Sequence, residues 1–234
     1  MKIRRIGPVL LALFMLFSGG CAGRRTSPPV SPVSAATTAS APAQASAFQF
    51  PVPDGVLPPR PELMPGAPRD YRGGVHEGID VYYKTGISMV SCGEQVFNCA
   101  DGMIIRSDTV WNPVGEKEYA SITTKLKQVL NEDYLDRLRG RQVWVRTADG
   151  ITIRYCHLES VAPGITAGIR VNQGVAIGTI GNSGTADGAR KTAKNCHLHL
   201  EIWMPDGKFL GAGLSQRDTR AAWSKLFGFT QPGK

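Results

Sequence analysis

The sequence predicts a mainly β domain, built on an antiparallel sheet and carrying a helical insertion, behind an N-terminal leader and a tether. Two observations predict the sheet: short segments of alternating apolar and polar residues, and hairpin turn signals between such segments at Asp101-Gly102 and Asp149-Gly150. A third observation predicts the tether, since twelve of the sixteen prolines lie in the first seventy residues.

Residues 1–20 have the pattern of a signal peptide. Three cationic residues give a positive start, and the apolar run over residues 8–17 is too short to span a bilayer. The small residues that follow lead into Cys21, and together they resemble a bacterial lipoprotein cleavage box, in which this cysteine becomes the lipid-bearing N-terminus. The alternative is ordinary cleavage near Ala22, which yields a secreted protein without an anchor.

Composition divides the rest of the chain into three parts. Residues 21–70 are rich in Pro, Ser and Ala and lack periodic apolar residues, so they are predicted to form a disordered tether. The globular domain is expected over residues 71–215. Residues 216–234 are expected to form a C-terminal tail with room for a short helix.

Within the domain, strands are predicted where short apolar runs are bounded by glycine turns: residues 81–89, 95–98, 103–106, 142–146, 151–157, 171–178, 179–184 and 195–203. Residues 107–140 break this pattern, because Tyr119, Ile122 and Leu126 recur at helical spacing and Gly140 suits a helix C-cap. We interpret these residues as a helical insertion that pads the sheet. The alternative is that the insertion lines one wall of a functional groove.

The segment 195–203 carries two histidines that point to chemistry. Residues i and i+2 of a strand share a face, so His197 and His199 are expected side by side, with Cys196 and Leu198 on the other face. Of two imidazoles on one rigid element, one can hold a metal while the other moves a proton. Taken alone, this motif has an alternative interpretation: two histidines at the surface whose hydrogen bonds are satisfied.

The other two histidines of the chain complete an ordered set of motifs. His76 opens the segment His-Glu-Gly-Ile-Asp, His157 lies in Tyr-Cys-His-Leu, and a glycine-rich stretch precedes the His-x-His strand. From about Tyr71 to Trp203 this order resembles the lysostaphin/LytM-type zinc metallopeptidases, which cut peptide bonds in bacterial cell-wall peptidoglycan. The resemblance implies the fold of that family, an antiparallel LytM-like sheet domain with a duplicated hybrid motif.

The resemblance also implies roles for five residues. It assigns one zinc ion to His76, Asp80 and His199, since hydrolytic zinc sites combine three protein ligands with an open position. It leaves His157 and His197 to act on the attacking water and on the oxyanion, without deciding which is the general base. The carboxylates that would orient the ligands, or would simply lie at the surface, are Glu77 and Glu201.

The chain has five cysteines, and an odd number in an exported protein needs an explanation. A lipid on Cys21 leaves four, which allow three pairings in an oxidising compartment. Because the resemblance makes the strands that carry Cys156 and Cys196 neighbours, we predict a Cys156–Cys196 disulfide on the face away from the histidines. The remaining pair is Cys92–Cys99. The alternative is four buried free thiols.

The formal net charge of +8 and the pI of about 9.4 suit an anionic partner. Nucleic acid is not expected, because no helix-turn-helix or zinc-finger spacing occurs. The expected partners are peptidoglycan stem peptides, and the membrane through the N-terminal lipid. A basic loop with Arg190, Lys191 and Lys194 would bind the carboxylates of wall peptides, or it is a solvated face. These expectations place a lipoprotein in the cell envelope, facing the periplasm or the cell wall, and leave its oligomeric state open.

Two functions from different classes fit these observations. The first is a zinc-dependent endopeptidase of peptidoglycan. The second is a non-catalytic LytM-like regulator that activates another wall hydrolase; a simple wall-binding module would leave the ordered histidines unexplained. Since all five expected site positions hold competent residues, the sequence favours the enzyme.

Overall fold

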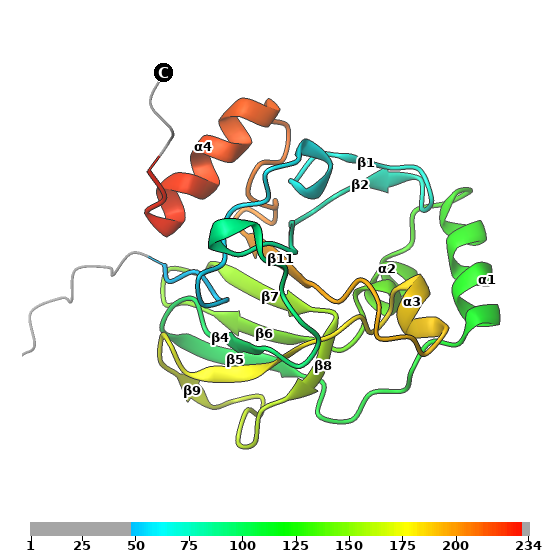
Figure 1. Cartoon of the computed structure of the whole chain (residues 1–234), viewed down its shortest axis with the longest axis horizontal. Helices are drawn as coiled ribbons and strands as arrows, with labels where there is room; N and C mark the ends of the chain where they lie inside the picture. Colours follow the sequence, from blue (N-terminus) through cyan, green and yellow to red (C-terminus); the bar gives the residue numbers. More distant parts are fainter. Residues whose placement is uncertain (1–47, 231–234) are drawn as a thin grey trace, which may run out of the picture. The chain divides into compact units, whose positions relative to one another are not determined.

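A computed structural model describes residues 48–230 of the chain (Figure 1). The expected signal peptide, the lipid at Cys21 and residues 21–47 of the expected tether lie outside these residues. No helix in the described part of the chain has the length and hydropathy needed to cross a membrane.

The largest sheet of the described residues has six strands, and every adjacent pair in it is antiparallel. Across the sheet the strands are β3 (Ile79–Val81), β11 (Leu198–Trp203), β7 (Thr152–Cys156), β6 (Val143–Arg146), β5 (Gly102–Ser107) and β9 (Arg170–Val171). A three-stranded antiparallel sheet contains β4 (Gln95–Phe97), β10 (Ala176–Ile180) and β8 (Leu158–Val161). A short ribbon pairs β1 (Pro68–Arg69) with β2 (Gly74–Val75). The predicted mainly antiparallel β class is confirmed.

One hydrophobic core joins the two larger sheets. Fully buried side chains come from both of them, for example Ile153 of β7 and Ile177 of β10. Burial alternates along β6 and most of β7, as expected for a sheet with one face in a core, whereas β3 and β11 are buried on both faces.

The predicted helical insertion is also confirmed. It forms α1 (Glu116–Leu126) and α2 (Glu132–Arg139), which bury a small cluster of their own around Leu126 and Leu135. Helix α2 is capped by Asn131, whose side chain accepts a hydrogen bond from the Tyr134 N–H. The other helices of residues 48–230 are the short α3 (Ala186–Ala189), α4 (Gln216–Phe227), and the 3₁₀ turns Pro61–Leu63 and Thr85–Ile87.

The domain extends beyond both predicted boundaries. Residues 48–70 were expected in a disordered tether, but Val52 and Met64 are almost completely buried, and the ring of Phe50 contacts that of Phe227 at 5.3 Å between centroids. In the C-terminal region, α4 packs on the core through Trp223, which has no exposed surface. The sequence did not reveal that residues 48–70 belong to the domain, because the apolar residues between their prolines follow no helical or strand period.

The prediction of a strand over residues 81–89 is wrong beyond Val81. Strand β3 ends at Val81, and a 3₁₀ turn follows over Thr85–Ile87. Gly86 in this turn has a φ of 78°, a conformation that a β-strand does not contain.

Both predicted disulfides are wrong. Cys92 bonds to Cys196, with 5.2 Å between their Cα atoms, while Cys99 and Cys156 are free and buried. The register of β11 on β7 places His199 opposite Cys156, so Cys196 lies three residues, about 10 Å, further along the strand. Cys99 lies in the core at the end of β4, whereas Cys92 is exposed ahead of that strand.

Candidate metal centre

The structure brings His76, Asp80 and His199 together at the edge of the six-stranded sheet. Strands β3 and β11 are neighbours, and their register places Asp80 opposite His199. His76 precedes β3 in the chain, and its Nε2 lies 3.0 Å from Asp80 Oδ1 and 3.0 Å from His199 Nδ1. The third side of this triangle, from His199 Nδ1 to Asp80 Oδ1, is 2.8 Å.

Gly78 allows the close approach of this segment to β11. A Cβ atom at this position would lie 2.2 Å from the carbonyl oxygen of Leu200, well inside van der Waals contact. The glycine in the His-Glu-Gly-Ile-Asp motif is thus needed for packing, since it lets the backbone between His76 and Asp80 lie against the strand that carries His199.

In His76 and His199, one ring nitrogen is a corner of the triangle (the inner nitrogen) and the other points away from it (the outer nitrogen). The hydrogen bond made by the outer nitrogen determines the tautomer of each ring. His76 Nδ1 lies 3.2 Å from the carbonyl oxygen of Met64, and His199 Nε2 lies 3.0 Å from Glu201 Oε1. Because these oxygens only accept hydrogen bonds, the outer nitrogens carry the hydrogens, and in neutral rings the inner nitrogens hold lone pairs. Two nitrogen lone pairs and a carboxylate oxygen then meet within 3.0 Å, an arrangement that a cation stabilises. This buried donor set suits zinc.

Burial keeps three of the four histidines neutral. It lowers the pKa of His76 to about 4, and it lowers the pKa values of His157 and His197 as well. Burial alone would also lower the pKa of His199, but hydrogen bonds to the carboxylates of Asp80 and Glu201 outweigh it and raise that pKa. A neutral imidazole can bind a metal or accept a proton, which is what the expected roles of His76, His157 and His197 require. At His199, a bound metal would have to displace the proton that the raised pKa favours.

His157 and His197 lie beside the triangle and are each held by a backbone carbonyl. The Nδ1 of His157 donates to Ser183 O at 2.8 Å, and the Nδ1 of His197 donates to Asn195 O at 2.8 Å. The two rings are 4.8 Å apart between centroids, and His197 Nε2 lies 3.6 Å from the carboxylate of Asp80. Each ring therefore keeps Nε2 as the nitrogen available for a proton.

His157 adopts an unusual backbone conformation, with a φ of 61°. This residue follows the last residue of β7, so it leaves the strand period that the sequence predicted for residues 151–157. Left-handed backbone is uncommon for residues other than glycine, and here it accompanies a side chain at the site.

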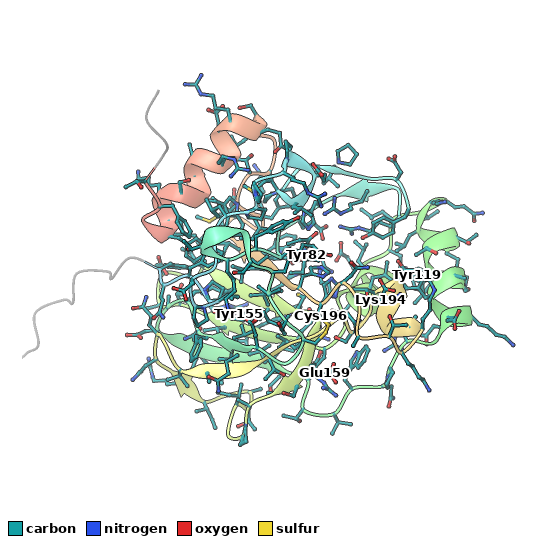
Figure 2. The ribbon with its side chains drawn as sticks, in the orientation of Figure 1. Tyr82, Tyr119, Tyr155, Glu159, Lys194 and Cys196 are labelled. Atoms are coloured by element: carbon teal, nitrogen blue, oxygen red, sulfur yellow. A yellow bond between two sulfur atoms is a disulfide. The ribbon has the colours of Figure 1, made fainter. Side chains whose placement is uncertain are left out.

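All five expected site residues line one cavity of about 490 Å³. One wall comes from residues 62–72, and another from the helical insertion through Tyr119, Leu135, Leu138 and Arg139. Figure 2 labels two of its tyrosines: Tyr119, which comes from α1, and Tyr82, which stacks on His197 at 4.3 Å between centroids. The interpretation of the insertion as padding is therefore wrong, since it borders the site.

The cationic residues of the expected basic loop do not line this cavity, although residues at both ends of the loop, Asp187 and Asn195, do. Arg190, Lys191 and Lys194 are all absent from its lining, and Lys191 instead lines a second cavity of about 640 Å³ beside the Cys92–Cys196 disulfide. The proposal that these cations bind substrate carboxylates at the metal centre gains no support from this arrangement.

Three arginines that were not expected from the sequence line the cavity, and two of them donate hydrogen bonds to carboxylates of the site. Arg69, which the sequence had assigned to the disordered tether, donates a hydrogen bond to Asp80 Oδ2 at 3.0 Å. Arg139, the last residue of α2, donates through Nε to Glu201 Oε1 at 2.6 Å. Neither residue belongs to a motif. The only signal in the sequence was the pair of acidic residues Glu77 and Glu201 beside the histidines, since buried carboxylates need cationic partners.

Part of the chain matches a known family. The sequence model described as Peptidase family M23 matches residues 113–210, a segment that includes His157, His197 and His199 and excludes His76 and Asp80. No curated protein matches the chain.

Three solved structures are among those similar to it. A zinc containing peptidase from Vibrio cholerae is 18% identical over 70% of this chain and 39% of that chain, with a TM-score of 0.45. A putative peptidase M23 from Pseudomonas aeruginosa is 18% identical over 81% of this chain and 55% of that chain, with a TM-score of 0.44. The catalytic domain of lysostaphin from Staphylococcus simulans is 19% identical over 66% of this chain and 80% of that chain, with a TM-score of 0.39. The chain thus spans less than two thirds of the length of the Vibrio cholerae and Pseudomonas aeruginosa proteins.

The family match covers the strands of the His-x-His and Tyr-Cys-His-Leu motifs, and the tertiary structure adds His76 and Asp80 to the same cavity. The chain is therefore similar to peptidase family M23 over residues 113–210, in line with its resemblance to the lysostaphin/LytM-type peptidases.

Proposed function

We propose that this chain is a zinc-dependent endopeptidase that hydrolyses peptide bonds in bacterial peptidoglycan. One observation carries the proposal: the inner nitrogens of His76 and His199 and the carboxylate of Asp80 converge, with two further neutral histidines beside them. A regulator would need neither the buried donor set nor the two additional imidazoles. The match of residues 113–210 to the model of peptidase family M23 supports the same reaction class.

In this proposal His76, Asp80 and His199 hold one zinc ion. Zinc supplies Lewis acidity, which lowers the pKa of water to about 7 and polarises a carbonyl group. The rings of His157 and His197 lie 4.8 Å apart between centroids. One would accept the proton of the attacking water at Nε2, and the other, after taking up a proton from solvent at Nε2, would donate a hydrogen bond to the developing oxyanion. The carbonyls of Ser183 and Asn195 hold these rings in the tautomer that frees Nε2.

The substrate is proposed to be the stem peptides of peptidoglycan, taken in an extended form along the cavity between residues 62–72 and the helical insertion. We also propose that Cys21 carries a lipid that anchors the chain in the cell envelope. The basic sequence supports both parts, since the wall and the membrane surface are anionic.

The test is digestion of purified peptidoglycan by the full chain, before zinc removal, after it, and after zinc is restored. We expect soluble fragments, identified by mass as products of peptide-bond cleavage, only when zinc is present. A chain that binds one zinc ion but releases no fragments, and instead stimulates a separate wall hydrolase, would refute the endopeptidase and support the regulator.

A further inference from the structure

The carboxylate of Glu201 has no exposed surface and uses its two oxygens differently. Oε1 accepts hydrogen bonds from His199 Nε2 at 3.0 Å and from Arg139 Nε at 2.6 Å. Oε2 accepts from Arg154 Nη1 at 3.2 Å and from Trp203 Nε1 at 2.6 Å. The oxygen that orients His199 is therefore shared with one arginine, and that arginine comes from the helical insertion.

The same guanidinium reaches the other side of the metal centre. Arg139 Nη2 donates to Glu77 Oε2 at 2.5 Å, and the arginine side chain is only 6% exposed. Glu77 follows His76 in the sequence, and Glu201 lies two residues after His199. One planar group thus joins the two segments that carry the two histidines of the triangle, a geometry that suits the fixed fork of an arginine.

The backbone around Arg139 is fixed to the site as well. Its carbonyl oxygen accepts a hydrogen bond from the His157 N–H at 2.9 Å. The next residue, Gly140, passes so close to Ser183 that a Cβ atom would lie 2.2 Å from the Ser183 carbonyl oxygen, which is the acceptor for His157 Nδ1. The end of α2 is therefore in direct contact with His157 and with the group that accepts its Nδ1 hydrogen.

We propose that Arg139 is a positioning residue for the metal centre. It holds Glu201 Oε1 where this oxygen accepts the Nε2 hydrogen of His199, and so keeps the Nδ1 lone pair of His199 directed at His76 and Asp80. The insertion then completes the site instead of only bordering it. This inference rests on the metal binding in the proposed function and is independent of the substrate.

The test measures the affinity of metal-depleted full-length protein for Zn²⁺ and Co²⁺, together with the visible spectrum of the Co²⁺ form. Arg139→Ala should weaken metal binding about 10–100-fold, the range found when a group that orients a metal ligand is removed, and should change the Co²⁺ spectrum. Arg139→Lys should bind metal with an affinity between those of the parent and Arg139→Ala, since lysine restores the charge and not the planar fork.

Two matched variants separate positioning from general stability. Arg137→Ala removes an arginine of the same helix that pairs with Glu118, and it should leave the metal affinity unchanged. Arg154→Ala removes the partner of the other oxygen of Glu201, so its effect on metal affinity should be smaller than that of Arg139→Ala.

Three outcomes would overturn the proposal. In the first, Arg139→Ala binds metal with the affinity and the Co²⁺ spectrum of the parent. In the second, Arg139→Ala and Arg154→Ala lose the same amount of metal affinity. In the third, circular dichroism shows that Arg139→Ala does not fold, and Arg139→Lys binds metal with the affinity of the parent. A parent protein that binds zinc but releases no peptidoglycan fragments would refute the proposed function only, because the affinities of the variants still report on Arg139.

Discussion

Replacing His199 and His197 in turn should separate metal binding from catalysis at this site. The two residues lie two positions apart and line the same cavity, yet the structure gives them different surroundings. His199 Nδ1 is a corner of the triangle, whereas His197 Nε2 lies outside it, 3.6 Å from Asp80 Oδ1. We expect His199→Ala to lose most of its zinc, and His197→Gln to keep zinc and lose activity.

The geometry sets the magnitudes. His199→Ala leaves only His76 and Asp80, two protein ligands where a hydrolytic zinc site uses three, so zinc should no longer copurify at one ion per chain. His197→Gln leaves the triangle intact. Loss of a general acid or base lowers the rate about 10²–10⁴-fold, which raises the barrier by about 3–5 kcal/mol at 1.36 kcal/mol per tenfold.

The assay combines the zinc content of each protein, measured by elemental analysis, with its rate of release of soluble peptidoglycan fragments. The parent is the reference, and circular dichroism of each variant controls for folding. Zinc loss in His197→Gln would contradict the division of roles, and so would full activity in that variant with zinc in place.

Three further predictions concern anchoring, the disulfide and acid stability. Cys21→Ser should release the protein from bacterial membranes into the soluble fraction, and unchanged membrane fractionation would show that the anchor lies elsewhere. The double substitution Cys92→Ala with Cys196→Ala opens a covalent loop with a sequence separation of 104, so urea denaturation should show a loss of about 4–5 kcal/mol; a loss below about 1 kcal/mol would contradict the pairing. In metal-free protein, burial lowers the pKa of His76 to about 4, so between about pH 6.5 and pH 4 the unfolded chain binds a proton that the folded chain does not. The free energy of unfolding of the metal-free protein should therefore fall as the pH falls through this window. It can be measured by urea denaturation in the presence of a chelator, and a value that does not change with pH would refute this reasoning.

The local periodicities of the sequence predicted much of the fold. Alternation over 151–157 and 195–203 corresponds to β7 and β11, and the helical spacing within 107–140 corresponds to α1 and α2. These patterns could be read because each records which side of an element faces the core, a property of neighbouring residues alone. The four histidines and Asp80 could be singled out for a similar reason, since the order and spacing of their motifs lie along the chain.

The cysteine pairing shows what the sequence left undecided. Cys196 does not meet Cys156, because β11 pairs with β7 in a register that places Cys156 opposite His199, and it bonds to Cys92 instead. A strand pattern defines the faces of each strand, but it does not define the register between two strands that are far apart in the chain.

The same reason explains the residues that only the tertiary structure placed at the site. Arg69 and Arg139 belong to no periodic pattern and lie 11 and 62 positions from their carboxylate partners Asp80 and Glu201. The sequence by itself determined which residue types could hold zinc and move a proton. Only the folded chain decided which cations stabilise the buried carboxylates behind them, because that choice depends on strand register and on where the helical insertion ends in space.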